Sequence, residues 1–206
     1  MSQNNGNLYI ISAPSGAGKT SLVEALLEAD KGLQVATSYT TRDSRPNEVD
    51  GINYHFISTS RFGQMIGANE FVEYAEVFGN FYGTSKQQIN GLLSAGSDVI
   101  LEIDWQGAQQ IRAMMPEAQS VFILPPSREA LEQRLKNRGQ DDDKVIAGRM
   151  AASVDEISHY LEFDYIVVND DFSAALAELQ AIFVSKRLEF AGQNQRLSAM
   201  IEGLLS

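Results

Sequence analysis

The amino-acid sequence predicts an α/β protein in which a parallel β-sheet is covered by helices on both faces. Short runs dense in apolar residues alternate along the chain with longer stretches typical of helices. Runs of this kind are typical of strands buried on both faces, and helical crossovers usually connect them. A glycine-rich segment stands between the first apolar run and the first helical stretch, which is the context of a phosphate-binding loop. Because ligands of such sheets bind at the carboxyl ends of the strands, we expect the functional site at that edge.

Length and composition favour a single globular domain. The chain has 206 residues, of which 44% are hydrophobic, and this is enough for one sizeable core with inserted subdomains. It holds no cysteine, so it has neither a disulfide framework nor a cysteine-based metal site. That suits a reducing compartment, and we expect a cytoplasmic protein. No signal peptide is visible and no apolar run approaches membrane-spanning length, so we expect no membrane partner.

The charge balance of the chain excludes one class of partner. The formal net charge is −11. General affinity for nucleic acid requires a basic face, so we expect no nucleic-acid partner. The same charge repels free nucleotides, so an anionic substrate requires arginines and lysines concentrated at one place.

The regular elements of the core follow from this alternation. The expected strands share dense apolar runs and cover residues 7–12, 98–104, 120–124 and 164–168. The expected helices cover residues 19–29, 85–94, 108–115, 128–137, 142–161 and 173–190.

The first strand leads into a glycine-rich loop. It consists of Ala13, Pro14, Ser15, Gly16, Ala17, Gly18, Lys19 and Thr20. In a loop of this kind, successive backbone N–H groups point inward and bind phosphate oxygens, helped by the positive end of the following helix. We expect Lys19 to reach the β- and γ-phosphates of a nucleoside triphosphate and the Thr20 hydroxyl to ligate Mg²⁺. Ala13 stands where the strict pattern has glycine, and the alternative is a glycine-rich turn that opens an ordinary helix.

Two segments interrupt the simple alternation. Residues 37–82 are rich in polar turns and contain alternating stretches such as 52–57, so we interpret them as a small mixed insert. Residues 127–161 are mostly helical and hold several arginines. The chain is therefore predicted to be one core with two excursions.

The insert concentrates groups that suit a fixed phosphate. Arg42 and Arg45 stand in one turn, and Tyr54 and Tyr82 follow. Arginine binds phosphate oxygens through two parallel hydrogen bonds, and tyrosine hydroxyls add neutral donors. The alternative is a solvated loop with scattered aromatic residues.

Five segments together make the chain resemble the guanylate kinases, and most of all the bacterial form. They are residues 12–20, Thr40-Thr41-Arg42 with Arg45-Pro46, Gly-Asn-Phe-Tyr-Gly-Thr at 79–84, Ile-Asp-Trp-Gln-Gly at 103–107, and Ile-Val-Val-Asn-Asp at 166–170. The resemblance runs from Leu8 to about Phe190. It implies a P-loop NTPase fold and an enzyme that transfers the γ-phosphoryl group of ATP to GMP, and more slowly to dGMP, in purine nucleotide metabolism.

The resemblance also implies a division of the chain. A guanylate kinase-like domain covers residues 6–190, and a helical tail covers 191–206. Within the domain, the core consists of 6–37, 85–126 and 162–190, a GMP-binding insert covers 38–84, and a lid covers 127–161.

The resemblance distributes the GMP contacts over the insert and one core position. It assigns the GMP phosphate to Arg42, Arg45, Tyr54 and Tyr82. It assigns the guanine or its immediate surroundings to Ser38, Glu73, Thr84 and Asp104. A carboxylate accepts from guanine N1 and the exocyclic amine, and a hydroxyl donates to O6. Adenine has no N1 donor and would leave the carboxylate unpaired, so such a site discriminates strongly between the two bases.

For ATP and catalysis, the resemblance adds residues outside the insert. It makes Arg138 and Arg149 lid residues that move onto the ATP phosphates, with Arg134 a weaker candidate, and their alternative role is surface salt bridging. The catalytic set is then Lys19, Arg42, Arg138 and Arg149.

Two further positions belong to the ATP side. Asn169 would contact or border the adenine, and its alternative role is a turn residue. Mg²⁺ would enter with ATP at Thr20. Glu102 is a second candidate near the metal, but the family usually has Asp-Ile-Asp where this chain has Glu102-Ile103-Asp104, which puts the role of Glu102 in doubt.

No general base is required, because the acceptor phosphate is already largely ionised near neutral pH. We therefore expect structural roles for the two histidines, His55 and His159. Alternative functions are another P-loop kinase with a different acceptor, or a scaffold module that binds phosphorylated peptides.

The apolar residues of the tail permit an amphipathic helix. We expect it to pack on its own domain, and the alternative is a subunit contact in a homo-oligomer.

Overall fold

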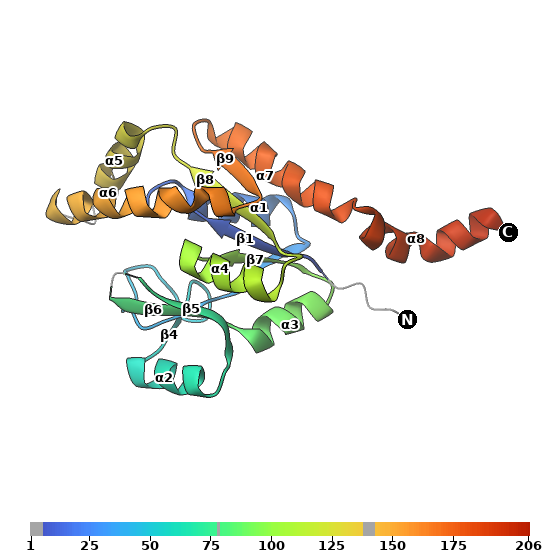
Figure 1. The fold of residues 1–206 in the computed structure, drawn as a ribbon, viewed down its shortest axis with the longest axis horizontal. Helices are drawn as coiled ribbons and strands as arrows, with labels where there is room; N and C mark the ends of the chain where they lie inside the picture. Colours follow the sequence, from blue (N-terminus) through green and yellow to red (C-terminus); the bar gives the residue numbers. More distant parts are fainter. Residues whose placement is uncertain (1–5, 78, 138–142) are drawn as a thin grey trace.

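A five-stranded parallel sheet forms the centre of the computed structural model, which describes residues 6–77, 79–137 and 143–206 (Figure 1). Its order is β2-β7-β1-β8-β9. The strands are β1 (Leu8–Ser12), β2 (Leu33–Val35), β7 (Asp98–Glu102), β8 (Gln119–Leu124) and β9 (Tyr165–Val168). The predicted α/β class with a parallel sheet is confirmed. Sequence reasoning missed β2, which has only three residues and no long apolar run.

The alternation of side chains along β1 builds one hydrophobic core on each face of the sheet. Tyr9 and Ile11 face a cluster with α1 (Lys19–Ala29) and α7 (Phe172–Arg187). Leu8 and Ile10 face a second cluster with α3 (Lys86–Ser94) and α4 (Trp105–Met114). Successive strand residues point to opposite faces, so a strand covered on both sides must be apolar throughout. All five residues of β1 are buried, which explains its continuous apolar run.

The segment interpreted as a mixed insert forms a second sheet of four strands, in the order β4-β3-β6-β5. Its elements are β3 (Tyr39–Thr40), β4 (His55–Phe56), α2 (Thr59–Gly67), β5 (Phe71–Val77) and β6 (Asn80–Ser85). Phe62, Met65 and Phe71 form a small core between α2 and this sheet. β5 packs against α4 of the central layer, so the second sheet is held beside the carboxyl edge of the first.

A helical excursion follows β8. It consists of α5 (Arg128–Asn137), α6 (Asp143–Ser158) and the 3₁₀ turn η1 (His159–Glu162). Leu131 and Leu135 of α5 pack on Ile146 and Met150 of α6. Figure 1 shows α6 and the second sheet projecting on the same side of the central sheet. Arg138 lies outside the described residues.

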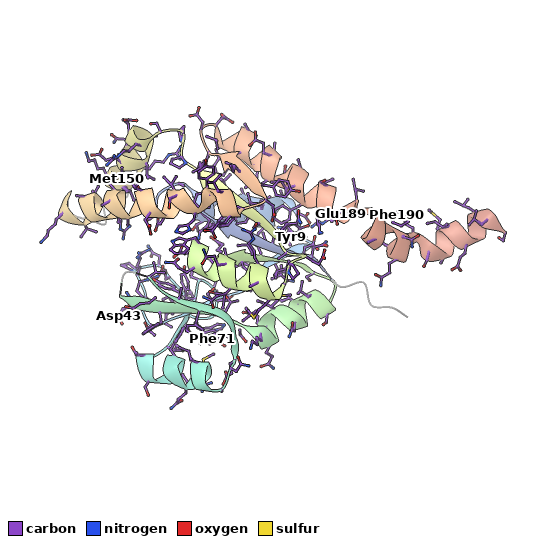
Figure 2. The ribbon with its side chains drawn as sticks, in the orientation of Figure 1. Tyr9, Asp43, Phe71, Met150, Glu189 and Phe190 are labelled. Atoms are coloured by element: carbon purple, nitrogen blue, oxygen red, sulfur yellow. The ribbon has the colours of Figure 1, made fainter. Side chains whose placement is uncertain are left out.

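The C-terminal helix α8 (Phe190–Leu205) does not pack on its own domain, so that expectation is wrong. None of its residues is buried, and the side chain of Phe190 is 82% exposed. Helix α7 ends at Arg187 rather than at residue 190, and the extended backbone of Glu189 (ψ 141°) turns the chain away from the sheet. Figures 1 and 2 show α8 projecting from the molecule, with Glu189 and Phe190 at the bend. Among the described residues, no helix combines the length and apolar character that crossing a bilayer requires.

Candidate active site

The phosphate-binding loop connects β1 to α1 through two glycines in the left-handed region. Gly16 and Gly18 both have φ of 97°, a conformation that disfavours any side chain. A Cβ atom on Gly18 would also lie 2.3 Å from the Asn169 side-chain nitrogen. The glycines therefore give the loop its curvature, and Gly18 lets Asn169, the residue directly after β9, approach the loop closely.

Two side chains from distant elements support this loop through one carbonyl group. Asn169, directly after β9, donates from Nδ2 to the Ala17 carbonyl at 2.8 Å. Arg134 of α5 donates to the Ala17 carbonyl at 3.3 Å and to the Asn169 carbonyl at 2.8 Å. Sequence reasoning missed this support, because the contacts join residues more than a hundred positions apart. The adenine contact of Asn169 stays a prediction.

Lys19 and Thr20 lie beside the acidic end of β7. The Lys19 ammonium donates to the Ile103 carbonyl at 3.4 Å and lies 3.9 Å from Asp104 Oδ1. The Thr20 hydroxyl donates to Glu102 Oε2 at 3.5 Å. Burial raises the pKa of Glu102, although Lys19 and Thr20 lower it. The structure thus brings together the two residues named for the metal.

The oxygens of Thr20 and Glu102 are ligands that suit Mg²⁺, which usually keeps several waters and binds substrate phosphates. Within the described ranges, no cluster of three or more histidine or acidic side chains is arranged to hold a metal ion by itself. A cation at this site would therefore depend on oxygens from a bound nucleotide.

The second sheet and the start of α4 enclose a buried carboxyl. Glu73 is 3% exposed, and its Oε1 accepts from the Thr84 hydroxyl at 2.6 Å. The Ser38 hydroxyl lies 3.2 Å from the same Thr84 oxygen. Burial raises the pKa of Glu73 to about 7, and the nearby Asp104 adds to the rise, while Thr84 opposes it. The structure therefore places these four predicted guanine-site residues in one neighbourhood.

Gly107 allows this carboxyl to lie against α4. A Cβ atom at position 107 would be 2.5 Å from Glu73 Oε2, which real Cβ atoms do not tolerate. Asp104 is the N-cap of α4, so the helix begins at Trp105, three residues before the predicted start. The glycine in the Trp-Gln-Gly segment is thus a packing requirement of the carboxyl site.

The residues predicted to hold a phosphate form a second group on the insert. The Arg42 guanidinium makes two parallel hydrogen bonds to Glu48, at 3.0 and 2.9 Å. It also lies 5.6 Å from the centre of the Tyr54 ring, which contacts Tyr82 edge to face. Arg45 is exposed, and its backbone N–H donates to Glu48 Oε2 at 2.7 Å. Sequence reasoning missed Glu48, which fixes the orientation of Arg42.

The two groups face the acidic end of the central sheet. Burial raises the pKa of Tyr54 to about 12, and the next largest cause is the charge of Glu102. Asp104 also raises the pKa of Tyr54. Tyr54 of the insert is therefore close enough to the carboxyl end of β7 to be affected by the charges of Glu102 and Asp104.

The helical excursion reaches the loop through a residue that sequence reasoning did not single out. Glu156 of α6 accepts from the Ser15 backbone N–H at 3.2 Å. Arg149 lies two helical turns earlier on α6 and is partly buried. The structure therefore places α6 over the loop, as a lid would be placed, and the role of Arg149 stays a prediction.

Comparison with known proteins identifies the family to which this arrangement belongs. A family model described as guanylate kinase matches residues 5–186. The chain belongs to the guanylate kinase family. The guanylate kinase of Hahella chejuensis is 59% identical over 201 residues, which cover 98% of this chain and 97% of that protein. The guanylate kinase of Pseudomonas fluorescens is 56% identical over 205 residues and matches along the full length of both chains.

A solved structure gives the same result for the fold. The crystal structure of guanylate kinase from Anaplasma phagocytophilum covers 95% of this chain and 95% of its own, with 30% identity and a TM-score of 0.77. The resemblance to guanylate kinases, the P-loop NTPase fold and the kinase class are therefore confirmed. The roles of the individual site residues remain predictions.

Proposed function

We propose that this guanylate kinase family member transfers the γ-phosphoryl group of ATP to GMP, giving ADP and GDP, and acts more slowly on dGMP. The observation that carries the proposal is the buried carboxyl of Glu73 with its two hydroxyl neighbours, Thr84 and Ser38. It lies beside Asp104, which in turn lies 3.9 Å from the loop lysine, Lys19. This arrangement supports a base pocket beside a triphosphate site.

The chemistry of the base pocket favours guanine. The N1 and exocyclic amine groups of guanine donate two parallel hydrogen bonds, which an ionised Glu73 can accept. The Ser38 hydroxyl can donate to guanine O6, and the Thr84 hydroxyl, which here donates to Glu73 Oε1, can do so after it rotates. Adenine offers an acceptor at N1, so it would leave a buried carboxylate unpaired and be rejected by roughly 10⁴-fold or more.

The acceptor phosphate would lie among Arg42, Arg45, Tyr54 and Tyr82. Arg42 presents a guanidinium whose orientation is already fixed by Glu48 and by the Tyr54 ring. A fixed fork loses less side-chain freedom when it binds phosphate oxygens. These residues would hold the acceptor in line with the ATP phosphates, and alignment of this kind lowers the barrier by several kcal/mol, about 7–11 at most.

Transfer itself would depend on neutralising charge. The loop N–H groups and Lys19 would bind the β- and γ-phosphates, and Arg149 with Arg138 would approach from the lid. Thr20 and Glu102 would help hold Mg²⁺ with ATP, where the ion neutralises charge on the phosphate oxygens. We also propose a role in purine nucleotide metabolism, from the substrates, and a cytoplasmic location, because a chain without cysteine suits a reducing compartment.

The first experiment offers different acceptors to the purified protein. ADP release from ATP and Mg²⁺ is measured with GMP, AMP, CMP and UMP in separate reactions. Turnover with GMP alone is the expected result. Turnover with another acceptor would retain the kinase but reject the guanine pocket, and no turnover with any acceptor would favour the scaffold module.

Lys19→Ala tests the phosphate-binding loop. We expect GMP-dependent ADP release to fall by orders of magnitude, about 10²-fold or more, because the main cation on the transferring group is lost. Lys31→Ala is the matched control, since Lys31 is exposed and its ammonium donates to the Leu27 carbonyl, away from the loop glycines. Circular dichroism verifies that both variants fold. Near-normal turnover in Lys19→Ala would contradict the assignment.

A further inference from the structure

A carboxylate from α6 occupies part of the loop that is built to bind anions. Glu156 Oε2 accepts from the Ser15 backbone N–H at 3.2 Å. The two residues are 141 positions apart in the sequence, so the contact joins the helical excursion directly to the loop. Backbone N–H groups of such loops ordinarily bind phosphate oxygens, and a carboxylate oxygen carries the same kind of negative charge.

The surroundings of Glu156 are unfavourable for a negative charge. Burial raises the pKa of Glu156, and Asp104 raises it further, while Ser15 and Lys19 lower it. A charged carboxylate therefore needs a compensating attraction to lie in this place. The N–H donor and the ammonium of Lys19 provide this attraction, and a nucleotide phosphate would provide the loop with a stronger anion.

We propose that Glu156 is an internal ligand of the phosphate-binding loop, which holds a loop N–H in the nucleotide-free protein and is displaced by the phosphates of ATP. The proposal deepens the function proposed above, because it requires that ATP binds at this loop. Glu156 is then a positioning residue, since it acts on ATP through the loop and through α6. Its release couples nucleotide binding to movement of the lid.

Helix α6 carries a cation near the carboxylate that ATP would replace at the loop. Arg149 and Glu156 are seven residues apart on α6, which corresponds to two turns, so their side chains leave the same face of the helix. Displacing the carboxylate leaves that face of α6 with the cation. Exchanging the Glu156 carboxylate for ATP phosphates removes a repelling charge from the loop, and Arg149 on the same face of α6 presents an attracting one.

The same region contains a natural reporter. His159 of η1, three residues after Glu156, stacks on Trp105 with ring centres 3.5 Å apart and planes 9° from parallel. Trp105 is the single tryptophan of the chain. The Nδ1 atom of His159 is hydrogen-bonded to Glu162 Oε1 at 2.6 Å. The Nε2 amide of Gln109, on α4, donates to Glu162 Oε2 at 2.8 Å. Movement of the end of α6 would change this stack and hence the emission of Trp105.

The test measures binding of ATP with Mg²⁺, without GMP, in Glu156→Ala and Glu156→Gln. We expect the dissociation constant to fall about five- to tenfold in Glu156→Ala, because a competing charged hydrogen bond and a repelling charge are removed. Glu156→Gln should show a smaller fall, since its amide oxygen can still accept from Ser15. Asp155→Asn is the matched control, because it removes the same charge from the neighbouring, exposed position. Its dissociation constant should equal that of the wild type.

Tryptophan emission gives the second readout. ATP should change the Trp105 emission of the wild type, and the ATP-free Glu156→Ala protein should already show most of that change. Unchanged or weaker ATP binding in both Glu156 variants would overturn the proposal, as would a fall shared by Asp155→Asn. A wild-type protein that binds no ATP would instead refute the proposed function, so the two failures are distinguishable.

Discussion

At the scale of single residues, the charged side chains of the site differ in whether a neighbour of opposite charge compensates them. Arg42 has a carboxylate partner in Glu48, and Lys19 lies near Asp104. The side-chain hydrogen bond of Glu73, by contrast, comes from a neutral hydroxyl, that of Thr84. A buried carboxyl held in this way is kept near its protonation midpoint at neutral pH, and a ligand with N–H donors favours the charged form.

Glu73→Gln should stabilise the ligand-free protein at and above neutral pH. The carboxyl has an ordinary pKa of 4.5 and a folded pKa of about 7. A raised pKa means that its contribution to stability is fully present below the ordinary value and is lost as the pH rises through about 7. Urea unfolding should therefore show a gain of roughly 2–3 kcal/mol at pH 8 that disappears toward pH 4.5.

The same substitution should lower the preference for GMP over AMP, because the amide cannot accept both guanine donors. Glu76→Gln is the control, since Glu76 is an exposed acid on the same strand, β5. Equal discrimination in Glu73→Gln and the wild type would remove Glu73 from base recognition. A stability gain of the same size at pH 4.5 and pH 8 would contradict the titration.

At the scale of elements, close approach between α4 and β5 builds the carboxyl pocket. Gly107→Ala should therefore weaken GMP binding, although alanine ordinarily favours a helix by about 1 kcal/mol. The new Cβ atom would lie 2.5 Å from Glu73 Oε2, so the helix or the carboxylate must move. We expect the KM for GMP to rise about tenfold and the unfolding free energy to fall by about 1–3 kcal/mol.

Gly91→Ala is the matched control for this change. Gly91 also lies within a helix, α3, and a Cβ atom there would meet no atom within 4 Å. This variant should gain about 1 kcal/mol and keep the KM for GMP. A Gly107→Ala protein that behaves like the control would show that the approach of α4 is not needed for the pocket.

Elements with a strong local pattern could be predicted from the sequence, and contacts between distant elements could not. The loop at 13–20 follows from its glycines and from the strand and helix around it. The α/β class follows from the apolar runs, which are buried on both faces of the sheet. Arg134 is named by the resemblance only as a weaker candidate for the ATP phosphates. The contacts of Glu48, Arg134 and Glu156 could not be predicted, because an acid or an arginine on a helix or in a turn has no pattern that names its partner.

At the scale of the whole molecule, α8 stands apart from the core, since none of its residues is buried. The whole chain exposes 11444 Å², whereas a compact monomer of this mass exposes about 9,500 Å². Removing residues 190–206 should therefore change the unfolding free energy by no more than about 0.5 kcal/mol, since no side chain of α8 is buried. Urea unfolding at low protein concentration checks this, and a loss of several kcal/mol would show that α8 belongs to the core.

Sedimentation of the full and shortened chains at rising concentration tests the subunit contact left open by the sequence. The stripe of Phe190, Leu197, Ile201 and Leu204 falls on one face of α8. An assembly that forms with the full chain and is lost with the shortened one would support a homo-oligomer. Equal monomer masses would reject it.

The support of Ala17 by Arg134 and Asn169 has a consequence for synthesis of the protein. The phosphate-binding loop is encoded within the first 20 residues, but the side chains that fix it come from α5 and from the end of β9. During translation, an emerging chain that has not reached residue 169 carries the loop without its support. We therefore expect the growing chain to acquire affinity for ATP late, so that nucleotide binding marks the completion of the central sheet.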